Sequence, residues 1–310
     1  MYCVSGLNVE SDIPFPELGS ADGRGPDCSF RLVRAHRSLR TPGRWLYHWR
    51  LPNGERWLSC AKRDAQYLLR FEELADFLIS RGGKRIACYA LPDTPDATVR
   101  HLFLDQVIPL VLNARGIEAL HASAVRTPYG AWAFIGEAGW GKSTLAASFA
   151  GSGFTPLSDD CLALAETEGD IVGVPSYPGL RLWSDAAATF CADIRPLPAV
   201  AHYTKKVRVA FPKEWCSAPV PLGRIYVLAP PIEHGGEAAI RIEPLSGRDS
   251  VMELVRYTFR LDIEDHRMLT REFLFLGTVV SRIPVRRLTY PRDLSLLPAV
   301  HSVICADLRR

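Results

Sequence analysis

The pattern of apolar and polar positions divides the chain into a β-rich first part and a mixed α/β second part. Within residues 1 to about 92, short runs rich in aromatic or β-branched residues alternate with turn signals such as Pro42-Gly43 and Pro52-Asn53-Gly54. The runs predict strands at Tyr2–Val9, Ser29–Val33, Trp45–Arg50, Arg56–Ala61, Gln66–Phe71, Asp76–Ser80 and Arg85–Tyr89. The last two flank Arg81–Lys84 (RGGK) and indicate a hairpin, although Leu74–Ile79 could instead form a helical turn.

A strongly apolar helix is predicted after residue 93. Asp93-Thr94-Pro95 has the form of a helix start, with Thr94 as the cap and Pro95 at the first helical position. Apolar residues then recur densely up to Gly116, with an interruption at Pro109. This helix marks the boundary between a β-rich N-terminal domain, residues 1–93, and a second domain, residues 94–310.

The second domain reads as alternating strands and helices, which indicates an α/β fold. The predicted strands are Leu120–Val125, Ala131–Ile135, Phe154–Leu157, Cys161–Glu166, Ile171–Val174, Arg224–Ala229 and Ile240–Ile242. The predicted helices are Thr144–Ala150, Ser250–Arg256, His266–Val280 and Leu294–Ile304. In the third of these helices the apolar positions are assigned to the core: Leu269, Phe273, Leu274, Leu276 and Val280.

Composition narrows the class of protein. The chain has 310 residues, of which 47% are hydrophobic, enough for one large core or two ordinary ones. A net charge of +3 without a Lys/Arg-rich block speaks against nucleic acid or membrane as a partner. The start lacks the features of a signal peptide, and no run of 18 apolar residues occurs, so we expect a soluble, cytoplasmic protein. Eight cysteines without a C-x-x-C pair predict reduced, mostly buried thiols.

The strongest chemical signal is Gly136–Thr144 (GEAGWGKST), which fits the P-loop pattern of Gly, four residues, Gly, Lys and Ser or Thr. A strand is predicted before it and a helix after it, as the motif requires. Glycines let the backbone N–H groups approach a triphosphate closely. Lys142 would reach the outer phosphates, and Ser143 would offer its hydroxyl to Mg²⁺. The predicted nucleotide-binding residues are Gly136, Glu137, Ala138, Gly139, Trp140, Gly141, Lys142, Ser143 and Thr144.

Two adjacent carboxylates follow the strand after the P-loop helix. Because neighbouring strand residues point to opposite faces, Asp159 and Asp160 can take the same role only if the strand ends there. We assign Asp159 to the metal and Asp160 to the base that accepts the proton of an attacking hydroxyl, while a turn-capping role stays open for either. His121, on the strand beside the P-loop strand, would assist Asp160 in this proton transfer, or would only donate a hydrogen bond to a main-chain carbonyl.

Four cations further along the chain are candidates for phosphate contacts. Arg181 follows a Pro-Gly turn, and Lys205, Lys206 and Arg208 follow Pro196–Pro198. Loops could carry these side chains toward a nucleotide, where transition-state charge needs neutralising. The alternative for each is a solvated surface charge.

Three segments together resemble the C-terminal kinase domain of the HPr kinase/phosphorylase family: LHASAV, GEAGWGKSTLAASFAGSGF and PLSDDCLAL, within Leu120–Leu164. The resemblance implies an α/β P-loop kinase domain of this type behind the β-rich domain, with ATP and Mg²⁺ as cofactors. In that family the histidine and the second Asp take part in proton transfer at a seryl hydroxyl, which would map to His121 and Asp160. Lys142 and Ser143 would map to the phosphate and metal contacts.

The chain departs from that family in its second signature. The Glu-Ile-Arg-Gly segment after the double Asp is missing, and Val174–Trp183 reads VPSYPGLRLW, which puts phosphorylase activity and HPr itself as substrate in doubt. This segment, LHASAV and the opening GLNVESDIPFPEL are similar to HPr-kinase-like proteins of ribosomal-peptide clusters. Among these, lasso-peptide precursor kinases phosphorylate a C-terminal serine. The resemblance therefore implies a serine-containing precursor peptide as partner. That the N-terminal domain, or its groove with the kinase domain, holds this peptide is a hypothesis without support from a motif.

Three other functions remain compatible with the motifs. A phosphoenolpyruvate carboxykinase-like lyase shares this type of core but needs further metal and carboxylate-substrate ligands that we do not find in the sequence. A kinase of a small molecule fits the P-loop equally well, and a non-catalytic nucleotide sensor that binds a partner needs no base. The nucleotide base and the oligomeric state, a homo-oligomer included, are not determined by the sequence.

Overall fold

The computed structural model describes residues 1–21, 23–41, 43–51, 53–190, 199–209, 215–233 and 236–307. The chain divides into two compact units, here called unit 1 and unit 2. Unit 1 comprises Met1–Ile117, Val200–Thr204 and Phe259–Arg271, and unit 2 comprises Glu118–Ala199, Lys205–Thr258 and Glu272–Arg310. Residues 94–117, which the sequence pattern assigned to the second domain, lie in unit 1, and the domain boundaries stay a prediction. Several residues that enter the predictions lie outside the described residues: Pro42, Pro52, Cys191 and Pro196–Pro198.

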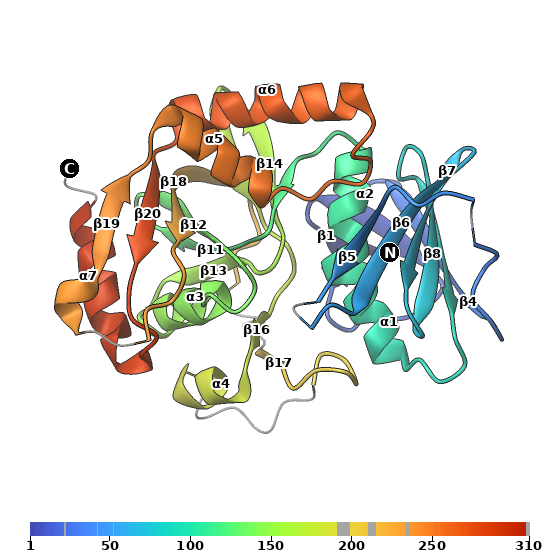
Figure 1. The fold of residues 1–310 in the computed structure, drawn as a ribbon, viewed down its shortest axis with the longest axis horizontal. Helices are drawn as coiled ribbons and strands as arrows, with labels where there is room; N and C mark the ends of the chain where they lie inside the picture. The colour runs from blue at the N-terminus through green and yellow to red at the C-terminus, as the bar shows by residue number, and fades with distance from the viewer. Residues whose placement is uncertain are drawn as a thin grey trace. The chain divides into compact units, whose positions relative to one another are not determined.

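Unit 1 is built on one large sheet (Figure 1). Its described strands are β1 (Tyr2–Val4), β2 (Leu7–Ser11), β3 (Gly19–Ser20), β4 (Cys28–Arg34), β5 (Tyr47–Arg50), β6 (Arg56–Arg63), β7 (Gln66–Phe71), β8 (Ala75–Ser80) and β9 (Arg85–Ala90). They pair in the order β3-β1-β2-β4-β9-β8-β7-β6-β5, and β4 is parallel to both its neighbours. The predicted hairpin is confirmed, with Ala75 opposite Ala90, so residues 75–79 form a strand and not a helical turn.

The first predicted strand, Tyr2–Val9, is wrong in detail, because it is a hairpin of β1 and β2. Ser5 and Gly6 form its turn with φ of 48° and 78°, and the left-handed backbone reverses the chain. Val4 and Leu7, on either side of the turn, are directly paired and buried.

The predicted helix is present as three consecutive segments. These are α1 (Asp96–Leu102), the π-helical segment η1 (Phe103–Val107) and α2 (Ile108–Ala114). Phe103 packs on Phe30 of β4, with ring centroids 4.4 Å apart. The predicted cap is wrong, since Pro95 occupies the N-cap position and the Thr94 hydroxyl donates to the Leu74 carbonyl. Pro109 does not end the helix: it is the second residue of α2, directly after the π-helical segment.

Unit 2 has a mixed sheet at its centre. Its described strands are β10 (Ala119–Leu120), β11 (Ala122–Thr127), β12 (Gly130–Ile135), β13 (Thr155–Ser158), β14 (Leu162–Thr167), β15 (Asp170–Val174), β18 (Val220–Leu228), β19 (Arg241–Pro244) and β20 (Val285–Thr289). The order is β10-β14-β15-β18-β12-β11-β13, and β20 joins β19 to β18. β12 and β20 each run parallel to β18, whereas β11 is antiparallel to β12 and β13. A separate pair is formed by β16 (Leu180–Leu182) and β17 (Val207–Val209).

Helices lie against both faces of this sheet. They are α3 (Lys142–Gly151), α4 (Ser184–Phe190), α5 (Gly247–Arg256), α6 (His266–Arg282) and α7 (Leu297–Asp307), with short 3-10 turns at η2 (Glu237–Ala239) and η3 (Leu294–Leu296). Successive residues of β12 alternate between two cores. Trp132 and Phe134 join α3 and α7, while Ala133 and Ile135 join α5 and α6. Figure 1 shows these two pairs of helices on opposite sides of the sheet, so the mixed α/β fold with large sheets is confirmed.

The core assignment for α6 is partly wrong. Leu276 is fully buried, but Phe273 is 58% exposed and Leu274 is 65% exposed. The buried positions of this helix are Glu272, Leu276 and Val279, which follow the helical spacing of three and four. Phe273 and Leu274 fall beside that stripe, on the solvent side.

The described cysteines are all free thiols, as predicted. Five are buried, namely Cys28, Cys60, Cys88, Cys161 and Cys216, whereas Cys3 is partly buried and Cys305 is exposed. None of the helices in the described ranges combines the length and the apolar character that a bilayer crossing requires.

Candidate active site

The glycine-rich segment joins the central strand β12 to helix α3. The loop runs from Gly136 to Gly141, and Lys142 is the first residue of α3. Gly139 and Gly141 have φ of 85° and 97°, a left-handed backbone that favours glycine. A Cβ on Gly141 would also lie 2.8 Å from the Tyr290 hydroxyl. Gly141 stands at the N-cap without a side chain, so the N–H groups of the first turn of α3 face the loop.

Lys142 lies inside the curve of this loop. Its side chain is buried, and Nζ donates to the carbonyls of Gly136 and Glu137 at 2.8 and 3.1 Å. Burial lowers the pKa of Lys142, while the charges of Asp160 and Asp159 act in the opposite direction. The carboxylate of Glu137 pairs with Arg256 of α5 at 2.7 Å. An ammonium group and the start of a helix thus converge at the loop, an arrangement suited to an anion.

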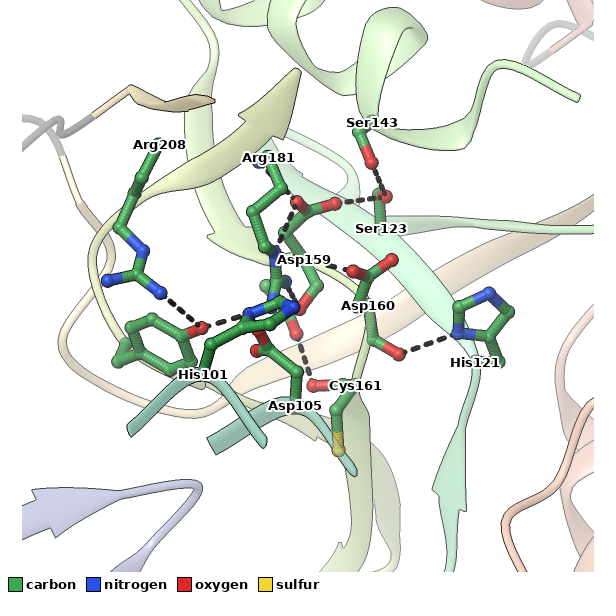
Figure 2. Close-up of polar contacts among 12 residues, drawn as sticks. His101, Asp105, His121, Ser123, Ser143, Asp159, Asp160, Cys161, Arg181 and Arg208 are labelled. Carbon is green, nitrogen blue, oxygen red and sulfur yellow. Dashed lines mark hydrogen bonds and ion pairs between the residues drawn. The ribbon is translucent and has the colours of Figure 1, made fainter. Parts of the chain in front are cut away.

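The carboxylate pair follows the end of β13 at Ser158. Asp159 is buried, and its Oδ1 accepts from the Ser123 hydroxyl at 2.6 Å. Its Oδ2 accepts from the main-chain N–H and from Nε of Arg181 at 2.7 and 3.3 Å. Asp160 has φ of 60° and lies beyond the strand, and its Oδ2 is 3.3 Å from the same Nε. The strand does end here, so both carboxylates contact one guanidinium (Figure 2).

The environment of Asp159 disfavours its negative charge. Burial and the neighbouring charge of Asp160 raise the pKa of Asp159 to about 7, although hydrogen bonds from Ser123, Arg181 and Ser143 act in the opposite direction. Near neutral pH the protonated and ionised forms of Asp159 are therefore close in free energy.

Ser123 connects the carboxylate to the glycine-rich segment. It lies on β11, and its Oγ is 3.5 Å from Oγ of Ser143 and 2.6 Å from Asp159. Figure 2 shows this series of contacts from Ser143 through Ser123 to Asp159. In the described ranges no three or more His, Cys, Asp or Glu side chains form a metal site. The oxygens that meet here, two hydroxyls and one carboxylate, are hard donors of the type that Mg²⁺ accepts together with water and phosphate oxygens.

His121 lies beside Asp160, but not within a strand as predicted. β10 ends before it and β11 begins after it, because β10 pairs with β14 whereas β11 pairs with β12. Its main-chain N–H donates to Tyr257, and its Nδ1 is 3.0 Å from the Asp160 carbonyl. Burial, with the charge of Lys142, lowers the pKa of His121 to about 4. The imidazole is therefore neutral at pH 7 and its Nδ1 contacts a main-chain carbonyl, while a part in proton transfer stays a prediction.

Arg181 is the site residue that sequence reasoning underestimated. The sequence presents it as one of several loop cations, yet it is 2% exposed and lies on strand β16. Its guanidinium also donates to the Asp159 carbonyl and, at 3.0 Å, to the Tyr177 hydroxyl. Arg208 lies on the same aromatic ring, 5.3 Å from its centroid. Lys206 lies 5.7 Å from the ring centroid of Trp183.

Two further residues were missed, and one of them left a signal. Ser123 stands two positions after His121, so a strand through both would place them on one face. Tyr177 gave no signal, because only the fold brings it between Arg181 and Arg208. Of the other predicted cations, Lys205 is exposed, while the charge of Lys206 acts on both His121 and Lys142.

No protein-family model and no curated protein matches the chain. Among solved structures, the Hpr(Ser) kinase/phosphatase from Coxiella burnetii is similar to it, with 15% sequence identity and a TM-score of 0.33. The match covers 62% of this chain and 99% of that one. At so low a score and identity the likeness gives no argument about activity, so function must come from the residues of the site.

Proposed function

We propose that the chain is an ATP-dependent kinase with a P-loop site in unit 2, and that it transfers a phosphate to a serine hydroxyl of a peptide. The observation that carries the proposal is the series of contacts from Ser143, at the start of α3, through Ser123 to the Asp159 carboxylate, which shares Arg181 with the Asp160 carboxylate. It joins an anion-binding loop to a pair of carboxylates, the two parts that phosphoryl transfer needs.

In this proposal the loop N–H groups and Lys142 bind the phosphates of ATP. Lys142 then exchanges its contacts with the Gly136 and Glu137 carbonyls for contacts with phosphate oxygens. Its positive charge then lies where negative charge develops during the transfer. Ser143 and Asp159 would hold Mg²⁺, which supplies charge neutralisation and orientation of the phosphates when bound.

Asp160 is the better base of the two carboxylates. The side chain of Asp159 is completely buried and both its oxygens accept hydrogen bonds, whereas that of Asp160 is 18% exposed. An acceptor hydroxyl can therefore reach Asp160 and give up its proton there as the phosphate is transferred. Arg181, ion-paired with both, keeps the two negative charges together in a buried place.

The proposed acceptor of the phosphate is a serine hydroxyl at the end of a precursor peptide. The motifs that resemble the HPr kinase/phosphorylase family support a seryl hydroxyl, and Val174–Trp183 with the opening segment supports the terminal serine of a lasso-peptide precursor. The missing Glu-Ile-Arg-Gly segment argues against HPr as substrate.

Mass spectrometry of serine-ended precursor peptides, incubated with the protein, ATP and Mg²⁺, tests the proposal. We expect a gain of one phosphate at the terminal serine with the wild type. Asp160→Asn should bind ATP as the wild type does and transfer about 10²–10⁴-fold more slowly, the usual contribution of a general base. Asp170→Asn, an exposed change on β15, is the matched control and should transfer normally.

The outcomes separate the alternatives. If the protein phosphorylates a small molecule but no peptide, the kinase part of the proposal stands and the peptide acceptor is refuted. ATP binding with no transfer to any acceptor by the wild type would refute the kinase and favour a nucleotide sensor.

A further inference from the structure

The main chain of Asp160 has a left-handed conformation, which residues with a Cβ seldom adopt, although aspartate does so more often than most. Its φ of 60° places it in the left-handed region, which is sterically costly for a residue with a Cβ. This conformation sends the Asp160 carboxylate to Arg181, beside Asp159, instead of to the opposite side of the chain. The local sequence Ser158-Asp159-Asp160-Cys161 supplies no glycine, although the Ser158 hydroxyl donates to the Cys161 carbonyl across the turn, and contacts from other elements add to this.

One such contact comes from His121. Its Nδ1 is 3.0 Å from the Asp160 carbonyl, and since a carbonyl only accepts, Nδ1 carries the hydrogen. The backbone of His121 is fixed in turn, with its N–H bonded to the Tyr257 carbonyl at 2.7 Å. Figure 2 shows the imidazole on the carbonyl side of Asp160 and Arg181 on the carboxylate side.

We propose that His121 is a positioning residue, which acts through its Nδ1–H on the main-chain carbonyl of Asp160 and so aims the carboxylate of that residue. The proposal rests on the proposed kinase function, in which Asp160 is the base. It differs from the role expected for His121 from the sequence, a direct part in proton transfer.

The charged groups around the imidazole favour this role. Lys142 of α3 and Lys206 before β17 both oppose a positive charge on His121, and Asp160 favours one. With burial added, the balance keeps the ring neutral at the pH where a kinase works, so its Nδ1–H remains a plain donor. A neutral donor fixed at both ends can orient a neighbour without exchanging protons.

A pair of matched substitutions tests the proposal. In His121→Asn the amide Nδ2–H₂ stands where Nδ1 does and can still donate to the Asp160 carbonyl, whereas in His121→Gln the amide stands near the position of Nε2. We expect His121→Asn to keep kcat within about threefold of the wild type, because the hydrogen bond survives. His121→Gln should lower kcat about 100-fold, the effect of misplacing a reacting group by about 1 Å, with KM for ATP unchanged.

The pH profile of kcat and the crystal structures of both variants complete the test. The acid limb of the profile should be the same in the wild type and in His121→Asn, and Asp160 should keep its positive φ in His121→Asn and lose it in His121→Gln. Equal losses in both variants, together with a changed acid limb, would overturn the proposal and make His121 a proton carrier. An unchanged Asp160 in His121→Gln would also overturn it.

These readouts distinguish this inference from the proposed function. If the wild type phosphorylates no peptide, the function fails, but the two crystal structures still show whether His121 holds Asp160. If the wild type is active and the Asn variant is as slow as the Gln variant, the inference fails alone.

Discussion

Replacing Arg181 by methionine tests the central electrostatic contact of the site. Methionine keeps the unbranched apolar stem of the side chain, but it is shorter and lacks the guanidinium that faces Asp159 and Asp160. The Asp159 carbonyl and the Tyr177 hydroxyl lose a donor as well. Removing one partner of a buried ion pair costs about 3–5 kcal/mol, because the other charge stays buried. We expect a loss of that size at pH 8, a large fraction of the stability of an ordinary domain.

The loss should depend on pH in a defined direction. The pKa of Asp159 is already raised to about 7 by burial and by the charge of Asp160. Arg181→Met keeps the main-chain N–H that donates to Asp159 but removes the guanidinium beside it, so the pKa should rise further. At pH 5 the Asp159 carboxyl is then protonated, so its charge no longer needs the guanidinium, whereas the pair with the partly exposed Asp160 is lost at both pH values. At Asp159 only hydrogen bonds remain to be lost, about 1–3 kcal/mol. The destabilisation should therefore be about 2 kcal/mol smaller at pH 5 than at pH 8.

Urea unfolding of the wild type and of Arg181→Met at both pH values measures this. Arg126→Met, an exposed change on β11 of the same sheet, is the control for removing a surface arginine and should be neutral within about 0.5 kcal/mol. Equal losses at pH 5 and pH 8, or a loss no larger than that of Arg126→Met, would refute the reasoning.

Two further predictions concern buried carboxylates. For Asp159, whose folded pKa of about 7 lies above the unfolded value, the native state holds an extra proton between the two values, so stability falls as pH rises through this window. Thermal unfolding should show the wild type losing about 2–3 kcal/mol relative to Asp159→Asn between pH 5 and pH 8, and parallel curves would contradict it. In unit 1, buried Asp262 accepts from Lys62 at 2.7 Å and from Tyr67 at 2.9 Å. Although burial raises its pKa, these bonds keep it below the usual value, so its stabilisation is present above the unfolded pKa and is lost as pH falls through the folded one. Asp262→Asn should cost about 2–3 kcal/mol in urea at pH 7 and less at pH 3, and an unchanged midpoint would contradict this.

The parts predicted well from the sequence are those that local pattern determines. β12 and α3 follow from an apolar run, a glycine-rich turn and a second apolar run within about 20 residues, and they were located almost to the residue. The strands β4 to β9 of unit 1 are separated by clear turn signals, and most were located in the same way. By contrast, the role of Phe273 and Leu274 was misjudged, because apolar residues at 273, 274 and 276 are compatible with more than one helix face.

The parts that could not be predicted depend on tertiary structure. Arg181 reaches Asp159 because β16 pairs with β17 and not with the main sheet, and that pairing has no local sequence signal. The strand break at His121 has the same origin, since it marks the point where the chain changes pairing partner from β14 to β12. In the sequence Arg181 shows only its charge and His121 only its ring, and neither indicates which group of the double Asp it contacts.

The site at Asp159 and Asp160 depends both on local sequence pattern and on tertiary structure. Its position after a strand was predicted, and the alternation of strand side chains would have sent the two carboxylates apart. The end of β13 at Ser158 and the left-handed backbone of Asp160 remove that alternation, and both carboxylates then face Arg181. A cation between the two carboxylates offsets their repulsion, and a donor at the Asp160 carbonyl gives the left-handed backbone a further contact. Arg181, from β16, is the first, and His121, from the break before β11, is the second.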